Sequence, residues 1–444
     1  MEGGSALPLV ERALASDGHV LDIQAVALFF DMWQPLGSRQ ICAARYPVVS
    51  LYKRHDIGLT RDCIDARLPE MKGSRPDFVS AQPLWWRMGL NEPTGYPFKC
   101  APVIADNAVF VADDRSRVWR HDAASGAIEW CYDSLAEPAK GIVQLLQHAD
   151  GSLVFGCYDG TLTRLDGRSG AVLWRWRLDS SIHATPALDL PRGRLFINTE
   201  QWNAGQPYGH LQALDWRSGK TIWKYGHAWW PPGSPVYDAQ TNSVIATCND
   251  QTVVALDAES GDLRWRRPTP GLVRGQPAIA QGRVMLATET GYLACLDLAD
   301  GAPLWSTRYG RGAMHQFLSI AAGRDGAGEV VIALDARWHL TAFDVASGEL
   351  RWISRLRSAG VWRPVVCGDY LVVLSQGGHL AVLDPRHEIK VWEGSVGGHY
   401  RQPPAVGWLD HADRSRTSVI ALASNDAGLK VFPINSFYQP GQLS

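Results

Sequence analysis

The stretch LDGRSGAVLWRWRLD, residues 165–179, contains an aspartate, a glycine four positions later and a tryptophan four positions after the glycine. This Asp–Trp spacing of eight residues occurs seven times along the chain. The pairs are Asp122/Trp130, Asp166/Trp174, Asp215/Trp223, Asp257/Trp265, Asp297/Trp305, Asp344/Trp352 and Asp384/Trp392. Glycine stands midway in six copies, whereas the seventh, LDPRHEIKVW, has His387 and Glu388 at that place. Successive tryptophans lie 40 to 49 residues apart, and a period of this size indicates a repeat architecture.

Each repeat contains four short apolar runs. In residues 272–310 the runs are QPAIA, RVMLAT, YLACLD and APLWSTR, and turn residues separate them. The runs have the length and composition of β-strands, and their connections are too short for crossover helices. We therefore expect neighbouring strands to be antiparallel and each repeat to form one four-stranded propeller blade.

The Asp–Gly–Trp frame spans the turn between the third and fourth strands of a blade. The aspartate can accept backbone N–H bonds that close the turn, and the glycine can take the positive φ that other residues resist. The tryptophan then lies on the outer strand, where its ring can cover the seam with the next blade. We interpret these residues as scaffold and not as a binding site.

Counting the blades predicts how the ring closes. Seven repeats cover residues 100–396, and the three strand-like runs RQPPAVGW, TSVIALASN and GLKVFPI follow without a fourth. The segment AQPLWWRMGLNEP (81–93) resembles an outer strand, so Trp85 or Trp86 is expected to supply the missing tryptophan. The predicted fold is all-β: an eight-bladed β-propeller of four-stranded antiparallel blades over residues 81–436, closed by an N-terminal strand.

Residues at the two ends of the chain have no repeat. Helix-compatible spacing in LPLVERALAS and LDIQAVALFFDMW predicts a small α-rich extension over residues 1–80. Residues 437–444 are expected to form a C-terminal tail. Because the extension is too apolar for a disordered segment, it is expected to form a small cap or a docked extension.

The segments ALDWRSGKTIW and ALDAESGDLRW resemble the tryptophan-docking repeat of propellers of the pyrroloquinoline-quinone type. That family includes the quinoprotein alcohol dehydrogenases and the scaffold propeller of the outer-membrane barrel assembly machine. The resemblance covers about residues 81–436 of this sequence. It implies the fold but does not decide the function, because one fold carries many functions.

For a dehydrogenase, the resemblance would imply a quinone stacked between a tryptophan and a disulfide of adjacent cysteines, beside a calcium ion. The sequence has no two adjacent cysteines and no cluster of Glu, Asn and Asp at strand starts that suggests the calcium. Quinone-dependent dehydrogenation is therefore disfavoured, and the likeness to the scaffold propeller is preferred. No cofactor is expected, and pyrroloquinoline quinone (PQQ) or a metal ion stays a less favoured alternative.

The composition excludes some classes of partner and cysteine chemistry. The formal net charge of the 444 residues is −2, so no basic field attracts nucleic acid. The eight cysteines are scattered, with no CxxC motif, so no zinc or redox motif is visible. Four of them fall in strand-like runs and are expected to be small buried hydrophobes: Cys157, Cys248, Cys295 and Cys367.

The first residues do not read as a targeting segment. They lack a basic start followed by an unbroken apolar core, and Asp22, Gln24 and Asp31 interrupt the most apolar run. We therefore expect neither a signal peptide nor a membrane span, and a cytoplasmic location.

Cationic or protonatable residues precede the inner strand in seven of the eight blades. They are Lys99, Lys140, His183, Arg274, His315, Arg363 and Arg401. Because the inner strands of a propeller line its axis, these side chains are expected to gather at one mouth of the channel and to raise the positive potential there. Such a ring favours an anionic ligand or an acidic segment of a partner. The alternative is that they are solvated rim residues, each paired with a nearby carboxylate.

Histidines and tryptophans border the same mouth. His183 and His315, joined by His399 or His227, could reach a metal ion in the closed fold, although no two have ligand spacing within one strand. The segment HAWWPPGSP (227–235) places Trp229 and Trp230 before two prolines, and Trp202 and Trp338 are expected in loops between middle strands. Aromatic rings among arginines are typical of interface hot spots, whereas the alternative is that these rings cap neighbouring blades.

These observations predict a non-catalytic scaffold that binds a protein or peptide partner at its rim. The alternative is an enzyme or small-ligand-binding propeller, in which histidines act as acid–base groups or metal ligands and arginines clamp an anion. The candidate binding residues are Lys99, His183, His227, Trp229, Trp230, Arg274, His315, Arg363, His399 and Arg401. The sequence shows no catalytic triad, phosphate loop or zinc signature, so it names no reaction.

Overall fold

The fold was analysed in a computed structural model of the chain. The structure describes residues 72–73, 83–87, 100–113, 117–133, 142–147, 150–203, 206–310, 318–323, 328–357, 362–424, 426 and 428–437. They belong to one compact unit, Leu68–Ser444. The α-rich extension expected over residues 1–80 lies outside this description, except for Lys72 and Gly73, and so does most of the expected tail.

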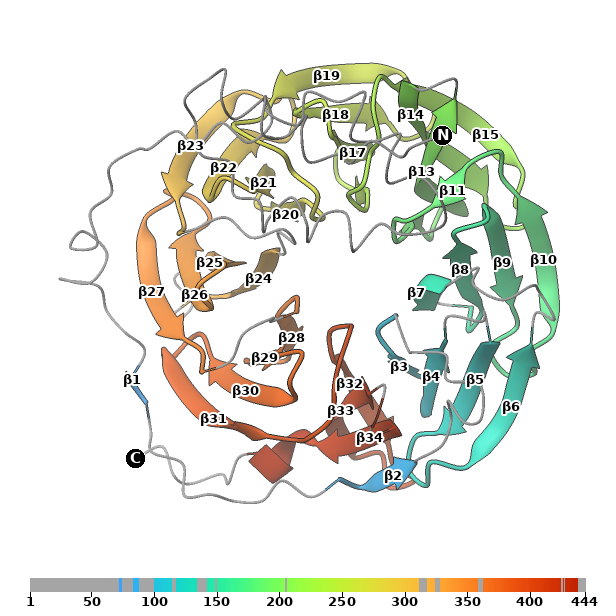
Figure 1. The fold of residues 1–444 in the computed structure, drawn as a ribbon, viewed down its shortest axis with the longest axis vertical. Coiled ribbons are helices and arrows are strands. Elements are labelled where there is room, and N and C mark those ends of the chain that lie inside the picture. Colours follow the sequence, from blue (N-terminus) through green and yellow to red (C-terminus); the bar gives the residue numbers. More distant parts are fainter. Residues whose placement is uncertain are drawn as a thin grey trace, which may run out of the picture. The chain divides into compact units, whose positions relative to one another are not determined.

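Eight β-sheets stand around a common axis, which confirms the predicted eight-bladed propeller (Figure 1). Within each blade the strands run from the axis outward, and consecutive strands are antiparallel. Blade one comprises β3 (Val103–Ala105), β4 (Ala108–Ala112), β5 (Arg117–Asp122) and β6 (Ile128–Asp133). Blade two comprises β7 (Ile142–Gln147), β8 (Leu153–Cys157), β9 (Thr161–Leu165) and β10 (Val172–Arg177).

Blades three to five follow in the same order. Blade three comprises β11 (Ser181–Ile182), β12 (Ala187–Asp189), β13 (Arg194–Asn203), β14 (Gln206–Asp215) and β15 (Thr221–His227). Blade four comprises β16 (Val236–Asp238), β17 (Ser243–Cys248), β18 (Thr252–Asp257) and β19 (Leu263–Pro268). Blade five comprises β20 (Ala278–Ala280), β21 (Arg283–Ala287), β22 (Tyr292–Asp297) and β23 (Pro303–Arg308).

The last three blades complete the ring. Blade six comprises β24 (Leu318–Ala322), β25 (Glu329–Leu334), β26 (His339–Asp344) and β27 (Leu350–Arg355). Blade seven comprises β28 (Val365–Cys367), β29 (Tyr370–Leu374), β30 (His379–Asp384) and β31 (Ile389–Ser395). Blade eight comprises β32 (Ala405–Asp410), β33 (Arg416–Ser424), β34 (Gly428–Pro433) and the N-terminal strand β2 (Trp85–Arg87), and the short 3-10 helix η2 (Ile434–Phe437) follows.

Two blades depart from the expected four strands. In blade three, β11 pairs with the far end of the long strand β13, which adds a fifth strand beside β12. In blade seven, β1 (Lys72–Gly73) pairs in parallel with the outer strand β31. The expectation that Trp202 lies in a loop is wrong, because β13 extends to Asn203 and pairs Trp202 with Pro207. The apolar alternation of the sequence did not indicate how far that hairpin continues.

The core consists of eight hydrophobic clusters, one at each seam between neighbouring blades. Each sheet is covered on both faces, so a middle strand such as β17 is buried along its whole length. This explains why these strands read as continuous apolar runs and not as an alternation of apolar and polar residues. The four cysteines expected in these strands are buried, which confirms that interpretation.

The Asp–Gly–Trp frame holds the seams as predicted. In the frame of blade five, Gly301 has φ +71° and lies against Trp265 of blade four, where an added Cβ would stand 2.7 Å from the indole ring. The indole Nε1 of Trp265 donates to the carbonyl of Leu298 at 3.0 Å. Glycine is therefore required twice, by its backbone conformation and by the approach of the ring. The frame aspartates accept backbone N–H bonds, as Asp166 does from Ser169 at 2.7 Å.

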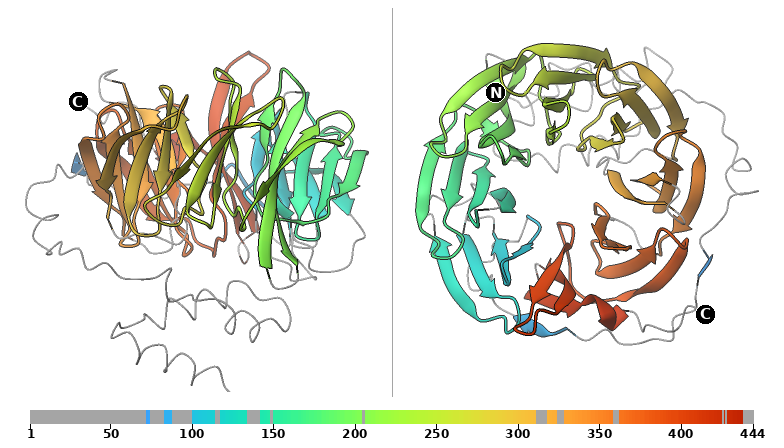
Figure 2. Two further views of the ribbon diagram at one scale, coloured as in Figure 1. Left: turned by 90° about the horizontal axis from the view of Figure 1, so that it is seen from above. Right: turned by 180° about the vertical axis from the view of Figure 1, so that it is seen from behind.

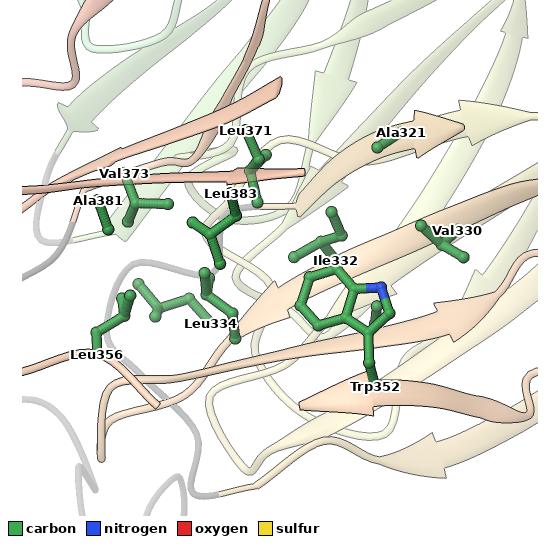
Figure 3. Packing of buried hydrophobic residues seen from close by; sticks show 12 residues of the cluster. Ala321, Val330, Ile332, Leu334, Trp352, Leu356, Leu371, Val373, Ala381 and Leu383 are labelled. Atoms are coloured by element: carbon green, nitrogen blue, oxygen red, sulfur yellow. The ribbon is translucent and has the colours of Figure 1, made fainter. Parts of the chain in front are cut away.

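At the seam between blades six and seven, Trp352 packs among aliphatic side chains (Figure 3). This seam lacks the contact between a tryptophan and a frame glycine. Blade seven has Glu388, at φ +58°, where the other frames have glycine. Trp352 of blade six is buried in the seam, but its Nε1 has no hydrogen-bond partner among the described residues. The replaced glycine and the unpartnered indole occur at the same seam. Among the described residues, packing contacts hold the indole of Trp352 in place there.

The N-terminal strand closes the ring as predicted. Trp85, Trp86 and Arg87 of β2 pair with Val431, Lys430 and Leu429 of β34. Trp85 is buried against Gly126 of blade one, and its Nε1 donates to Ala123 O at 2.8 Å. Trp85 is therefore the missing docking tryptophan, whereas Trp86 is exposed.

Two hairpins extend from opposite faces of the ring (Figure 2). We call the face at which the inner strands begin the start face and the opposite one the far face. The β13–β14 hairpin extends on the start face, because β11, which precedes the inner strand β12, pairs with its end. The β32–β33 hairpin, drawn in red, extends on the far face. No helix of the described residues is long and apolar enough to cross a membrane.

Candidate binding site at the start face

The antiparallel order of the strands brings the predicted rim residues to one face. Each inner strand begins where the chain returns from the outer strand of the preceding blade, so residues before it lie at the start face (Figure 1). Among the described residues these are His183, Arg274, Arg363 and Arg401, which precede β12, β20, β28 and β32. Lys99, Lys140 and His315 lie outside the described residues, so the complete ring stays a prediction.

Arg274 interacts electrostatically with two carboxyl groups. Its Nε is 2.7 Å from Oε1 of Glu289, and both side chains are largely buried. Glu200, on β13 of blade three, is 6% exposed, and burial raises its pKa to about 7, against the opposing charge of Arg274. Burial also raises the pKa of Glu289. This arginine is therefore compensated, as the alternative of paired rim residues predicts.

Arg363 joins distant blades at the mouth of the channel. Its Nη1 donates to Oε1 of Gln276 in blade five at 2.6 Å, and Nε2 of Gln276 donates to Pro235 O in blade four at 3.4 Å. The side chain of Arg363 is exposed, yet the surrounding protein desolvates it enough to lower its pKa. A guanidinium remains charged at neutral pH, so Arg363 presents a fixed positive group.

His183 does not add positive charge at neutral pH. Burial lowers its pKa to about 4, so the imidazole is neutral at pH 7. Its ring lies 4.8 Å from that of Tyr158, measured between centroids. We therefore interpret His183 as a packing residue with a polar edge. The positive electrostatic potential at the mouth of the channel then depends on the arginines.

His399 and Arg401 stand at the start of blade eight. The backbone N–H of His399 donates to Oδ1 of Asp426 at 2.6 Å, and the backbone N–H of Arg401 donates to Oε1 of Gln402 at 3.1 Å. Both side chains are exposed. The backbone of this segment is held while its two basic side chains extend outward.

The segment 227–235 is fastened to blade three. Nε1 of Trp230 donates to Gln201 O of β13 at 3.0 Å, so this ring caps its neighbour, as the alternative interpretation predicts. His227 is buried at the end of the outer strand β15, and burial lowers its pKa to about 4. Its place on an outer strand separates it from the residues that precede the inner strands. Trp229 is half-buried.

No group of three His, Cys, Asp or Glu side chains among the described residues is arranged to hold a metal ion. The described cysteines that were expected to be buried lie on strands of four different blades, Cys157 on β8, Cys248 on β17, Cys295 on β22 and Cys367 on β28. They do not fit the adjacent-cysteine pair of a quinone pocket. His183 and His399 therefore stay without support as metal ligands.

The sequence did not reveal Glu200, Glu289 and Gln276 as rim residues. Glu200 follows the run FINT on one strand, and Glu289 lies in the turn ETG between two others. Arg274 and Glu289 both belong to blade five, whereas Glu200 of blade three comes near Arg274 only in the closed ring of blades. A polar residue within an otherwise apolar strand was the single available signal for Glu200.

A cavity of about 410 Å³ lies at the far face, where β3, β28 and β32 end. Ile104, Val366 and Trp408 line it, with the ion pair between Asp410 and Arg416 at 2.6 Å. None of the candidate residues named from the sequence lines this cavity. It is separated from the start face by the length of the inner strands.

Comparison with known proteins supports the resemblance seen in the sequence. The model of the family described as outer membrane protein assembly factor BamB matches residues 83–229 and 207–426. BamB of Burkholderia pseudomallei (strain K96243) is 25% identical over 311 residues, which are 64% of this chain and 74% of that protein. A polyvinylalcohol dehydrogenase of a Pseudomonas species is 25% identical over 212 residues, which are 37% of this chain and 33% of that protein.

A solved structure shares the fold. The crystal structure of BamB from Moraxella catarrhalis superposes with a TM-score of 0.58 at 20% identity, covering 76% of this chain and 96% of that one. Identity at this level supports the fold alone, whereas the family model spans most of the propeller. The chain therefore belongs to the family of the outer membrane protein assembly factor BamB.

Proposed function

We propose that this propeller is a non-catalytic scaffold that holds a protein partner at its start face. The observation that carries the proposal is the pair of exposed arginines, Arg363 and Arg401, on the face that also carries the fastened tryptophan segment 227–235. Such a surface combines fixed positive charge with aromatic rings on a rigid support, which is the composition of interface hot spots. An acidic segment of the partner would complement the arginines.

The relatives support a role in assembly. The BamB of Burkholderia pseudomallei matches 64% of this chain, whereas the polyvinylalcohol dehydrogenase matches 37%. By analogy, the partner would be a protein that takes part in assembling outer membrane proteins. The cytoplasmic location predicted from the sequence is a separate proposal, and fractionation of cells followed by immunoblotting of this chain distinguishes the cytoplasm from the envelope.

The test compares two double variants of the full chain. Arg363→Ala with Arg401→Ala removes the exposed charges of the start face. Arg168→Ala with Arg217→Ala removes two exposed charges from turns between third and fourth strands, which lie at the far face. Each tagged protein is purified from its own cells, the bound proteins are identified by mass spectrometry, and each candidate is then titrated as a purified protein by calorimetry. We expect one partner whose affinity falls at least about tenfold for the first variant only. Equal affinity for all three proteins would refute the proposal.

A second function is favoured by one observation, the pKa of Glu200 near 7 beside Arg274. A buried carboxyl that titrates near neutrality is a candidate acid–base group or ligand contact. The alternative is therefore binding of a small anionic ligand at the same mouth. Titration with PQQ and with citrate, followed by tryptophan fluorescence, tests it. Saturable binding that Arg363→Ala weakens would support the alternative, and no change in fluorescence would count against it.

A further inference from the structure

The outer edge of blade seven already carries an added strand. Residues Lys72 and Gly73 pair in parallel with Ile389 and Lys390 of β31, outside the four strands of the blade. The frame tryptophan Trp392 follows two residues after Lys390 on the same strand. The chain itself therefore shows how an extended segment joins the outer strand of a blade.

The equivalent edge of blade two has no such strand among the described residues. In β10, Val172 stands two residues before Trp174, where Lys390 stands before Trp392. Three large apolar side chains of β10 are exposed, Val172 by 48%, Leu173 by 48% and Trp176 by 42%. The outer strands β6, β15, β19 and β23 each expose one large apolar side chain. Blade two thus has the most apolar of these open edges.

The edge of blade two is also positively charged. Arg175 and Arg177 of β10 are exposed, and no carboxylate of the described residues forms an ion pair with either. On the neighbouring strand β15, by contrast, Lys224 already pairs with Asp179 at 3.0 Å. Two exposed arginines without a carboxylate partner make an acidic segment the complementary occupant.

The edge is held rigidly by the two tryptophans of β10. Nε1 of Trp174 donates to Trp216 O of blade three at 2.9 Å, and Nε1 of Trp176 donates to Ser218 O at 2.5 Å. Both rings lie against Gly219. A strand fixed in this way loses less conformational entropy when another strand pairs with it.

We propose that β10 accepts an extended acidic segment of a protein partner as an added parallel strand. The backbone groups at the edge supply the pairing, Val172 and Leu173 supply apolar contact, and Arg175 and Arg177 select acidic side chains. This site lies on the circumference of the ring and is separate from the start face.

The probe is a fluorescein-labelled peptide of alternating valine and glutamate, about eight residues long, which matches the length of a strand. Its binding to the full chain is measured by fluorescence anisotropy. Arg175→Glu with Arg177→Glu should weaken binding by about tenfold, the effect of two exposed ion pairs. Val172→Thr with Leu173→Thr, which removes apolar contact but places residues of high β-propensity in the strand, should also weaken binding. The control, Arg337→Glu with Arg355→Glu, makes the same change of charge on blade six, where both arginines are exposed, and should bind as the wild type does.

Hydrogen exchange locates the peptide. Backbone amides of β10 should exchange more slowly when the peptide is bound, whereas those of β19 should not change. Arg363→Ala with Arg401→Ala should leave the affinity unchanged, which distinguishes this site from the start face. The proposal is wrong if the peptide does not bind, if the charge reversal on β10 has no effect beyond that of its control, or if protection appears only at the start face.

Discussion

At the scale of the residue, one glycine shows how closely the frame is specified. Gly301 combines φ +71° with an indole ring that an added Cβ would approach to 2.7 Å. Gly282 has a similar φ of +68°, but no atom within 4 Å of its added Cβ. The two positions therefore separate the cost of backbone strain from the cost of the clash.

We predict that Gly301→Ala destabilises the protein more than Gly282→Ala does. A left-handed conformation costs an alanine roughly 1–2 kcal/mol, and overpacking adds roughly 1–3 kcal/mol. Only the first cost applies to Gly282. Urea unfolding of both variants measures the loss of unfolding free energy. Equal losses in the two variants would show that Trp265 moves aside without an energetic cost.

A second residue, Glu200, should make stability depend on pH. Burial raises its pKa from 4.5 to about 7, so the folded protein binds more protons than the unfolded chain between these values. Stability from this group is therefore lost as the pH rises through that interval. Glu200→Gln should remove this dependence and stabilise the protein by about 1–3 kcal/mol at pH 8 relative to pH 5.

The measurement is the urea midpoint of wild type and variant from pH 5 to pH 8. Glu259→Gln, at an exposed position in a turn, serves as the control. If Glu200→Gln keeps the full slope of the wild type, the carboxyl of Glu200 does not titrate in this range.

At the scale of the element, the closing strand β2 depends on one of its two tryptophans. Trp85 is buried in the seam with blade one, together with Val111 and Val431. Trp86 is exposed by 51% and contacts Lys430, whose Nζ lies 5.0 Å from the ring centroid. Adjacent residues on a strand point to opposite sides, so the same strand has one structural and one exposed indole.

We predict that Trp85→Ala destabilises the propeller by about 3–5 kcal/mol, the usual cost of removing a buried aromatic ring. Trp86→Ala should cost about 1 kcal/mol or less, the contribution of an exposed cation–π contact. Thermal unfolding followed by circular dichroism compares the two. Similar melting temperatures would mean that β2 does not close the ring in solution.

At the scale of the whole molecule, the turn aspartates act together across the blades. In the folded protein the pKa values of these aspartates are lowered. The chief cause is the hydroxyl of Ser125 for Asp122 and the hydroxyl of Ser169 for Asp166. For Asp257 the chief cause is the side chain of Arg264, and the pKa falls to about 2. A depressed pKa contributes stability above the unfolded value of 3.8, and this contribution is lost as the pH falls through the folded value.

The protein should therefore lose stability between about pH 4 and pH 2, an acid transition that reflects many blades at once. Ser125→Ala combined with Ser169→Ala and Ser218→Ala removes three of the side-chain hydrogen bonds and should make the loss on acidification smaller. Ser306→Ala is the control, because Ser306 is exposed on β23 and forms no hydrogen bond with an aspartate of the described residues. An unchanged acid transition in the triple variant would contradict this role of the turns.

Much of the fold could be predicted because its repeat is local. The turn Asp166–Gly170 and its tryptophan lie within one short stretch, and the spacing of seven such stretches gives the number of blades. The site could be predicted only in part. Glu200 interacts with Arg274, and Arg363 with Gln276, although the two members of each pair belong to different blades. The periodicity of the sequence does not predict which side chains meet across a closed ring of blades.

The sequence by itself determined the blades, the docking tryptophans and the strand that closes the ring, because hydrogen bonding and turn geometry act between residues close along the chain. The tertiary structure alone decided which rim residues are charged and accessible: it buried His183, paired Arg274 with Glu289 and left Arg363 and Arg401 exposed. It also added β1 to blade seven, whereas no described strand pairs with the outer edge of β10. Desolvation and ion pairing depend on the positions of all neighbouring atoms, and those positions exist only once the eight sheets stand around their common axis.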